Sequence, residues 1–135
     1  MKSILKSVLA LTLVLSLNSC SKDDDAATTA MTNAKITVTD ANGRVSGMVV
    51  YVYDETTWEV IGDDPIFAEG QASTDEQGIA TFSNLEYPTT FNDINNNQNT
   101  MRFSAHYSLN GVEKTKVTAI TFTKGESKTG TLLLN

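Results

Sequence analysis

The chain has 135 residues, with ten lysines and arginines, 16 aspartates and glutamates, and a formal net charge of −6. This length fits one domain plus a targeting segment. The negative charge opposes nucleic-acid binding, which would require a clustered basic face. A single cysteine excludes an intrachain disulfide.

Residues 1–19 have the three parts of a signal peptide: a start with two lysines, an apolar stretch over 8–17, and a short polar end. The apolar stretch is far shorter than the ~20 residues that span a bilayer as a helix. Residues 17–20, Leu-Asn-Ser-Cys, resemble a lipobox, where a bacterial lipoprotein is acylated on cysteine and cut just before it. The resemblance implies a palmitate-bearing membrane anchor on Cys20. The alternative is an ordinary secretory signal with an incidental cysteine.

Acylation of Cys20 would remove the only thiol of the chain, which excludes cysteine nucleophiles and thiolate metal sites. The tract that follows consists of Ser21, Lys22, Asp23, Asp24 and Asp25. Its simpler interpretation is a solvated charged linker. It is also similar to the signal by which some Gram-negative bacteria send lipoproteins to the outer face of the outer membrane. We expect residues 20–33 to form a flexible tether, because 26–33 are small and polar.

Residues 34–135 are expected to form one all-β domain, because short alternating stretches are divided by turn signals. The expected strands cover residues 35–39, 48–53, 58–61, 71–74, 79–83, 101–108, 112–123 and 129–134. Asn42-Gly43, Asp75 to Gly78 and Asn110-Gly111 supply turns between them. No helical period is visible, so the sequence predicts an antiparallel sandwich of seven or eight strands.

Residues 36–85 also carry an ordered set of landmarks. They are Asp40 and Gly43, Val50 and Val52 before Asp54, then Trp58, Thr74-Asp75 with Gly78, and Ala80, Phe82 and Leu85. This order resembles the transthyretin-like (prealbumin-like, Ig-like) sandwich, a group that includes the carboxypeptidase regulatory-like modules of bacterial surface proteins. Residues 54–78 are particularly similar to transthyretin and hydroxyisourate hydrolase. Because these landmarks are turn and core signals, they specify fold better than function.

The resemblance raises an enzyme as one alternative. Hydroxyisourate hydrolases use two histidines, an arginine and a C-terminal Tyr-Arg-Gly-Ser-type tail, whereas this chain has only His106 and ends Leu-Leu-Leu-Asn. A nucleophile elbow of the form Gly-x-Ser-x-Gly is also missing. By alternation His106 shares the polar face of its strand with Ser104 and Ser108, so we expect it to face solvent. The sequence therefore predicts a non-catalytic domain without a cofactor.

A calcium-stabilised adhesion or glycan-binding module is the second alternative. Asp93, Asn95 and Asn97 place oxygen ligands as an EF-hand loop begins. Gln98 stands where such a loop needs glycine, and Ser104 stands where it needs glutamate. These three residues are therefore weak metal candidates, and an asparagine-rich turn is the simpler interpretation.

Two further groups of side chains are candidates for binding. One is acidic and would form either a solvated rim or a site if its loops converge: Asp54, Glu55, Asp63 and Asp64. The other is aromatic and would stack on a sugar or a partner if it lined one exposed face: Tyr51, Tyr53, Trp58 and Tyr107. The sequence thus predicts an outer-membrane, surface-exposed lipoprotein that serves as a binding or structural module for an unknown protein or glycan.

Overall fold

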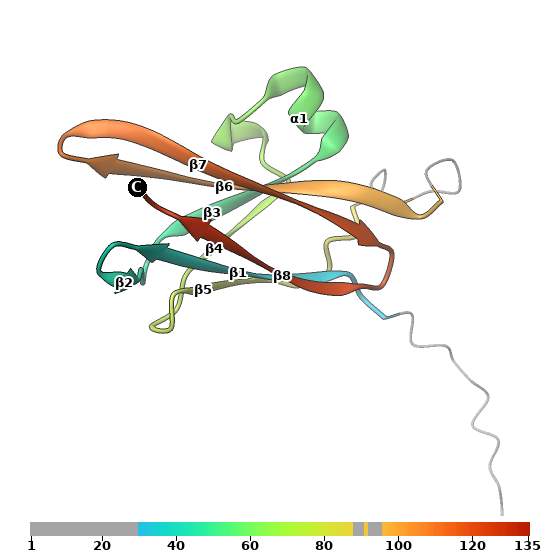
Figure 1. The fold of residues 1–135 in the computed structure, drawn as a ribbon. Helices are drawn as coiled ribbons and strands as arrows, with labels where there is room; N and C mark the ends of the chain where they lie inside the picture. The colour runs from blue at the N-terminus through green and yellow to red at the C-terminus, as the bar shows by residue number, and fades with distance from the viewer. Residues whose placement is uncertain (1–29, 88–90, 92–95) are drawn as a thin grey trace, which may run out of the picture.

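A computed structural model describes residues 30–87, 91 and 96–135. This part of the chain folds into two β-sheets that pack face to face, with one α-helix outside them (Figure 1). The elements are β1 (Asn33–Asp40), β2 (Gly43–Arg44), β3 (Val49–Asp54), α1 (Glu55–Ile61), the 3-10 helix η1 (Pro65–Phe67), β4 (Gly70–Ser73), β5 (Ile79–Phe82), β6 (Gln98–Leu109), β7 (Val112–Thr123) and β8 (Ser127–Leu133). The expected all-β sandwich of about eight strands is confirmed.

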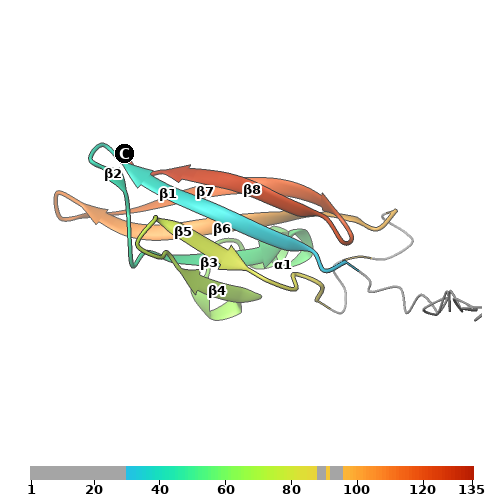
Figure 2. The same ribbon diagram turned by 90° about the horizontal axis from the view of Figure 1, so that it is seen from below.

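The first sheet is built around β1. Figure 2 shows β1 between β5 and β8, and the short β2 pairs with the end of β1. The second sheet has the order β4-β3-β6-β7, with antiparallel neighbours throughout. One pair departs from the antiparallel expectation, because β8 runs parallel to β1 from Asn33↔Ser127 to Thr39↔Leu133. The chain therefore leaves β7 and crosses to the opposite sheet.

The core lies between the inner faces of the two sheets. Phe103 in β6 meets Phe82 of the other sheet edge-to-face, with ring centroids 5.2 Å apart, and meets Phe122 at 6.4 Å. Such aromatic pairs contribute about 0.5–1.5 kcal/mol each beyond the area they bury. Alternate residues of the flanking strands complete the core: Ile36, Val38, Val50, Val52, Ala80, Met101, Ala105 and Leu132. The period-two alternation of the sequence thus selects the buried face of each strand.

Two of the predicted turns form as expected. Asn110 and Gly111 both have positive φ, at 54° and 77°, which a two-residue type I′ hairpin requires. The carboxylate of Asp75 accepts hydrogen bonds from the backbone N–H groups of Gln77 and Ile79, each at 2.9 Å. Both turns are set by local side-chain chemistry, which explains why the sequence reveals them.

The strand expected at residues 58–61 is wrong, because this stretch belongs to helix α1. The carboxylate of Asp54 caps the helix by accepting from the N–H of Thr57 at 2.7 Å. Gly62, with φ of 79°, ends it by donating its N–H to the carbonyl of Trp58 at 2.9 Å. These caps prevail over the β preference of tryptophan, valine and isoleucine.

The folded domain begins inside the stretch expected to be a tether. Thr32 is fully buried, and its hydroxyl accepts from the N–H of Gly125 at 2.7 Å and donates to Glu86 at 3.1 Å. Its carbonyl accepts from the N–H of Leu85 at 2.9 Å. Residues 1–29, which include Cys20 and the acidic tract, lie outside the described residues, so the anchor stays a prediction.

Candidate functional site

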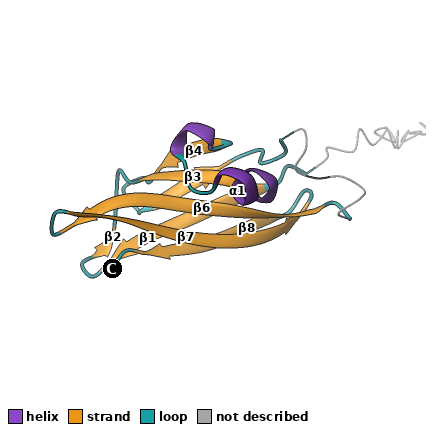
Figure 3. Cartoon of the chain, turned by 90° about the horizontal axis from the view of Figure 1, so that it is seen from above, coloured by secondary structure: helices purple, strands orange, loops and turns teal. Residues whose placement is uncertain are grey.

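The most elaborate polar arrangement lies where residues 54–69 leave the second sheet. Figure 3 shows α1 on the outer side of β3 and β6, and the helix contacts both strands. We call residues 54–69, which carry α1 and η1, the helical excursion. Ser104 and His106, which the sequence placed on one face of their strand, contact this excursion through Asp63.

Asp63 is the centre of this arrangement. Its Oδ2 accepts a hydrogen bond from Ser104 Oγ at 2.7 Å and lies 3.0 Å from His106 Nε2. Ser104 is fully buried, whereas the His106 side chain is 35% exposed. The serine therefore gives its proton to a carboxylate and not to the histidine, which differs from a nucleophile paired with a general base.

Tyr53 lies in β3 beside this group. Its hydroxyl and Asp63 Oδ1 are both buried without a hydrogen-bond partner among the described residues. Burial is the main cause that raises the pKa of Tyr53, and the neighbouring Asp63, then Asp64, raises it further. A neighbouring carboxylate disfavours the phenolate, so Asp63 adds to the effect of burial on the pKa of Tyr53, although no hydrogen bond joins the two side chains.

Arg102 fastens the helix to the sheet. Its Nη2 and Nε lie 2.8 Å and 3.1 Å from the two carboxylate oxygens of Glu55. Its guanidinium also lies over the ring of Trp58, 5.3 Å from the centroid, and Trp58 meets Tyr53 edge-to-face at 5.4 Å. The pKa of Arg102 is raised, mainly by its hydrogen bond to Glu55. A bidentate pair of this kind fixes orientation as well as distance.

The four acidic candidates do not converge into one site. Asp54 and Asp64 cap α1 and η1, with Asp64 Oδ1 accepting from the N–H of Ile66 at 3.0 Å. Glu55 is paired with Arg102 and Asp63 with Ser104. Among the described residues, no three His, Cys, Asp or Glu side chains gather as they would around a metal ion.

The four aromatic candidates do not line one exposed face. Tyr53 is buried beneath Trp58, and Tyr51 packs edge-to-face on His106 at 5.7 Å. Tyr107 donates its hydroxyl proton to the main-chain oxygen of Asn135 at 2.9 Å. A shared, exposed aromatic platform is therefore not formed by these side chains.

The calcium candidates fall at the edge of the described residues. Asp93 and Asn95 lie outside them. Asn97 has φ of 56° and follows Asn96 at 55°, directly before β6. Asparagine tolerates this left-handed conformation well, which fits the interpretation of these residues as a turn.

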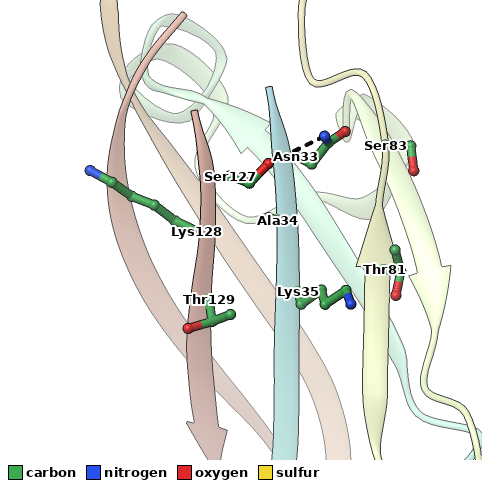
Figure 4. Close-up of a pocket in the computed structure, with 8 residues that line it drawn as sticks. All are labelled: Asn33, Ala34, Lys35, Thr81, Ser83, Ser127, Lys128 and Thr129. Carbon is green, nitrogen blue, oxygen red and sulfur yellow. Dashed lines mark hydrogen bonds between the residues drawn. The ribbon is translucent and has the colours of Figure 1, made fainter. Parts of the chain in front are cut away.

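A shallow groove with a volume of about 450 Å³ lies on the outer face of the first sheet (Figure 4). Its lining is rich in hydroxyl groups: Asn33, Ala34, Lys35, Thr81, Ser83, Ser127, Lys128 and Thr129. Lys128 points away from it, and its ammonium donates to the carbonyl of Thr121 at 2.7 Å. Lys35 is thus the cation of the groove. Hydroxyl residues alternate at Thr81 and Ser83 and again at Ser127 and Thr129, but only the pairing of β5 and β8 on either side of β1 brings them together.

No family model matches the chain, and no curated protein matches it. Within the described part of the chain, no helix is both long and apolar enough to cross a membrane.

Proposed function

We propose that this protein is a non-catalytic lipoprotein of the outer membrane, held by a lipid on Cys20 and displayed at the cell surface. Its transthyretin-like sandwich acts as a binding or structural module. The lipobox-like residues 17–20 and the acidic tract 21–25 support the anchor and its direction. The all-β sandwich supports the resemblance in fold.

The distance between anchor and domain supports this arrangement. Thr32 is the first buried residue in the part of the chain that the structure describes, and 11 residues separate it from Cys20. Even fully extended, such a tether reaches about 40 Å. The domain would therefore stay close to the membrane surface, within reach of partners in or near that membrane.

The observation that carries the non-catalytic assignment is the geometry at Asp63. The only histidine of the chain and the buried Ser104 both engage the same carboxylate oxygen. These contacts fasten the helical excursion to β6. Ser104 and His106 thereby hold the helical excursion in position, and this structural role supports binding as the function of the surface.

Metabolic labelling with a palmitate analogue tests the anchor. We expect label on the wild-type protein in its Gram-negative host and none on the Cys20→Ala variant, which should leave the membrane fraction. Thr28→Ala, a change within the tether, is the matched control and should be labelled like the wild type. An unlabelled wild-type protein, or a labelled Cys20→Ala variant, would contradict the proposal.

Protease treatment of intact cells tests outward display. We expect the wild-type domain to be digested and the variant Asp23→Ala/Asp24→Ala/Asp25→Ala to be protected while still carrying the lipid. Both proteins should be digested after lysis, which controls for intrinsic resistance. Protection of the wild-type protein in intact cells would refute display at the surface.

A further inference from the structure

The helical excursion exposes an unusual amount of apolar surface. Val60 and Ile61 are 79% and 42% exposed, and Ile66 and Phe67 are 85% and 50% exposed. We call these four residues the apolar knob. They lie within eight consecutive residues, so the ends of α1 and η1 are near one another: Ile61 and Pro65 are separated by at most about 14 Å. A group of exposed apolar side chains commonly marks an interaction site.

The apolar knob does not hold the excursion in place. Neither α1 nor η1 contains a buried residue. The excursion is fastened to the sheet by the Glu55–Arg102 pair, the Asp63–Ser104 bond and the packing of Trp58 on Tyr53, while the two aspartate caps hold the helices themselves. A further bond runs from Thr57 Oγ1 to Glu69 Oε1 at 2.6 Å. The knob is therefore presented on a preformed scaffold, which lowers the entropy lost when it binds.

The charge around the knob indicates the kind of surface that it fits. Residues 54–69 contain six carboxylates and no lysine or arginine: Asp54, Glu55, Glu59, Asp63, Asp64 and Glu69. Arg102 pairs with Glu55 and its charge also acts on Glu59, Asp54 is buried, and Asp63 is bonded to Ser104, so the remaining carboxylates keep the surface of this stretch negative. An acidic border of this kind repels an anionic lipid surface and a second copy of the same knob, and it attracts a basic protein surface.

We propose that Val60, Ile61, Ile66 and Phe67 dock into an apolar pocket of a partner protein that is bordered by lysine and arginine. This inference deepens the proposed binding role and rests on it, but it does not depend on the lipid anchor. The apolar side chains supply the binding energy at the centre of the contact, and the carboxylates around them supply orientation and speed of association.

Selection from a displayed library of random peptides on the purified protein tests this inference. We expect enriched peptides to combine an aromatic or large aliphatic residue with lysine or arginine. Their affinity should fall about tenfold or more for Ile66→Ser/Phe67→Ser, and several-fold as salt rises from 50 to 500 mM, as expected when charges steer the contact. Leu133→Ser is the matched control, because Leu133 is 49% exposed, as Phe67 is at 50%, but lies in the other sheet.

A charge variant separates the two parts of the inference. Glu59→Gln should weaken binding of the same peptides and reduce its salt dependence, while leaving the apolar contact in place. Unchanged melting temperature and Trp58 emission would establish that the variants are folded.

Several results would overturn the inference. These are a failure to enrich peptides, enrichment without basic residues, or equal binding to Ile66→Ser/Phe67→Ser. Knob-dependent binding to phosphatidylcholine vesicles would assign the surface to a membrane, and knob-dependent dimerisation would assign it to a second copy. None of these results bears on palmitate labelling or protease accessibility, so failure here is distinguishable from failure of the lipoprotein proposal.

Discussion

Gly130 is a point where the two sheets leave no room for a side chain. It lies in β8 opposite Ile36, and a Cβ added there would stand 2.7 Å from Ile120 Cδ1 and 3.2 Å from Ile36 Cδ1. Overpacking of this kind costs about 1–3 kcal/mol, and the lower end applies because the nearest atom is the tip of a flexible side chain. Reduced freedom of the unfolded chain offsets about 0.4–1 kcal/mol. We therefore expect Gly130→Ala to lower the free energy of unfolding by up to about 1 kcal/mol.

Repeating the Gly130→Ala change in an Ile120→Val variant tests whether the loss of stability is caused by the clash with Ile120. Ile120→Val removes the Cδ1 that lies in the way and leaves Cγ1 at 3.6 Å, an ordinary contact. The valine change alone should cost about 0.5–1.5 kcal/mol. Adding Gly130→Ala to it should cost less than in the wild type, because only the 3.2 Å approach of Ile36 Cδ1 remains. Urea and thermal unfolding give the stability of the wild type, the two single variants and the double variant. For a domain near this size, a change of 1 kcal/mol shifts the melting temperature by about 4–8 °C. An equal loss from Gly130→Ala in both backgrounds would refute the steric reasoning.

Three further predictions concern the contacts of the helical excursion. Asp63→Ala should cost about 1–3 kcal/mol in urea unfolding, because it leaves the buried Ser104 hydroxyl without its acceptor, and Ser104→Ala should recover part of that loss in the double variant. Tyr53→Phe should be neutral or stabilising at pH 7, since it removes a buried hydroxyl without a partner. The raised pKa of Tyr53 means that the unfolded chain ionises first, near pH 10, so the wild type should lose stability as pH rises above that value and Tyr53→Phe should lose less of it. Arg102→Met should change the emission of Trp58, the only tryptophan, while lowering stability by no more than about 1 kcal/mol, because the ion pair is partly exposed.

The strands could be predicted wherever the alternation of apolar and polar residues within one segment determines them. The alternation of Met101, Phe103 and Ala105 against polar neighbours predicts a half-buried strand, and all three side chains are fully buried. The pairing of β8 was not predictable in the same way. The short turn at residues 124–127 would allow a hairpin between β7 and β8, yet β8 crosses to the other sheet and pairs with β1, which lies more than 90 residues away in sequence. No local signal distinguishes these two pairings, because the choice depends on which sheet leaves an open edge beside β1.

The polar contacts of the candidate site could not be predicted from the local sequence either, because they also join residues far apart in the chain. Asp63 and Ser104 are 41 residues apart, and only the path of the excursion across the sheet brings them together. The sequence did place Ser104 and His106 on one face of their strand, and this holds: both engage Asp63 from that face. It did not predict that this face would be covered, because residues 58–61 are expected as a strand and Asp63 as part of a loop, and neither expectation brings Asp63 onto β6.

That misassigned segment is informative about function. Residues 58–61 have the β preference of a buried strand, and their apolar side chains would have a natural place in the core. The caps at Asp54 and Gly62 instead hold them in a helix with no buried residue, so Val60 and Ile61 remain exposed. A sequence optimised only for the sandwich would replace Val60 with a polar residue at little cost to stability, because its side chain is 79% exposed. Local choices that conflict with the core tend to persist where another molecule uses them. The conflict at the helical excursion therefore includes Val60 and Ile61, two of the four residues that the docking inference identifies from their exposure.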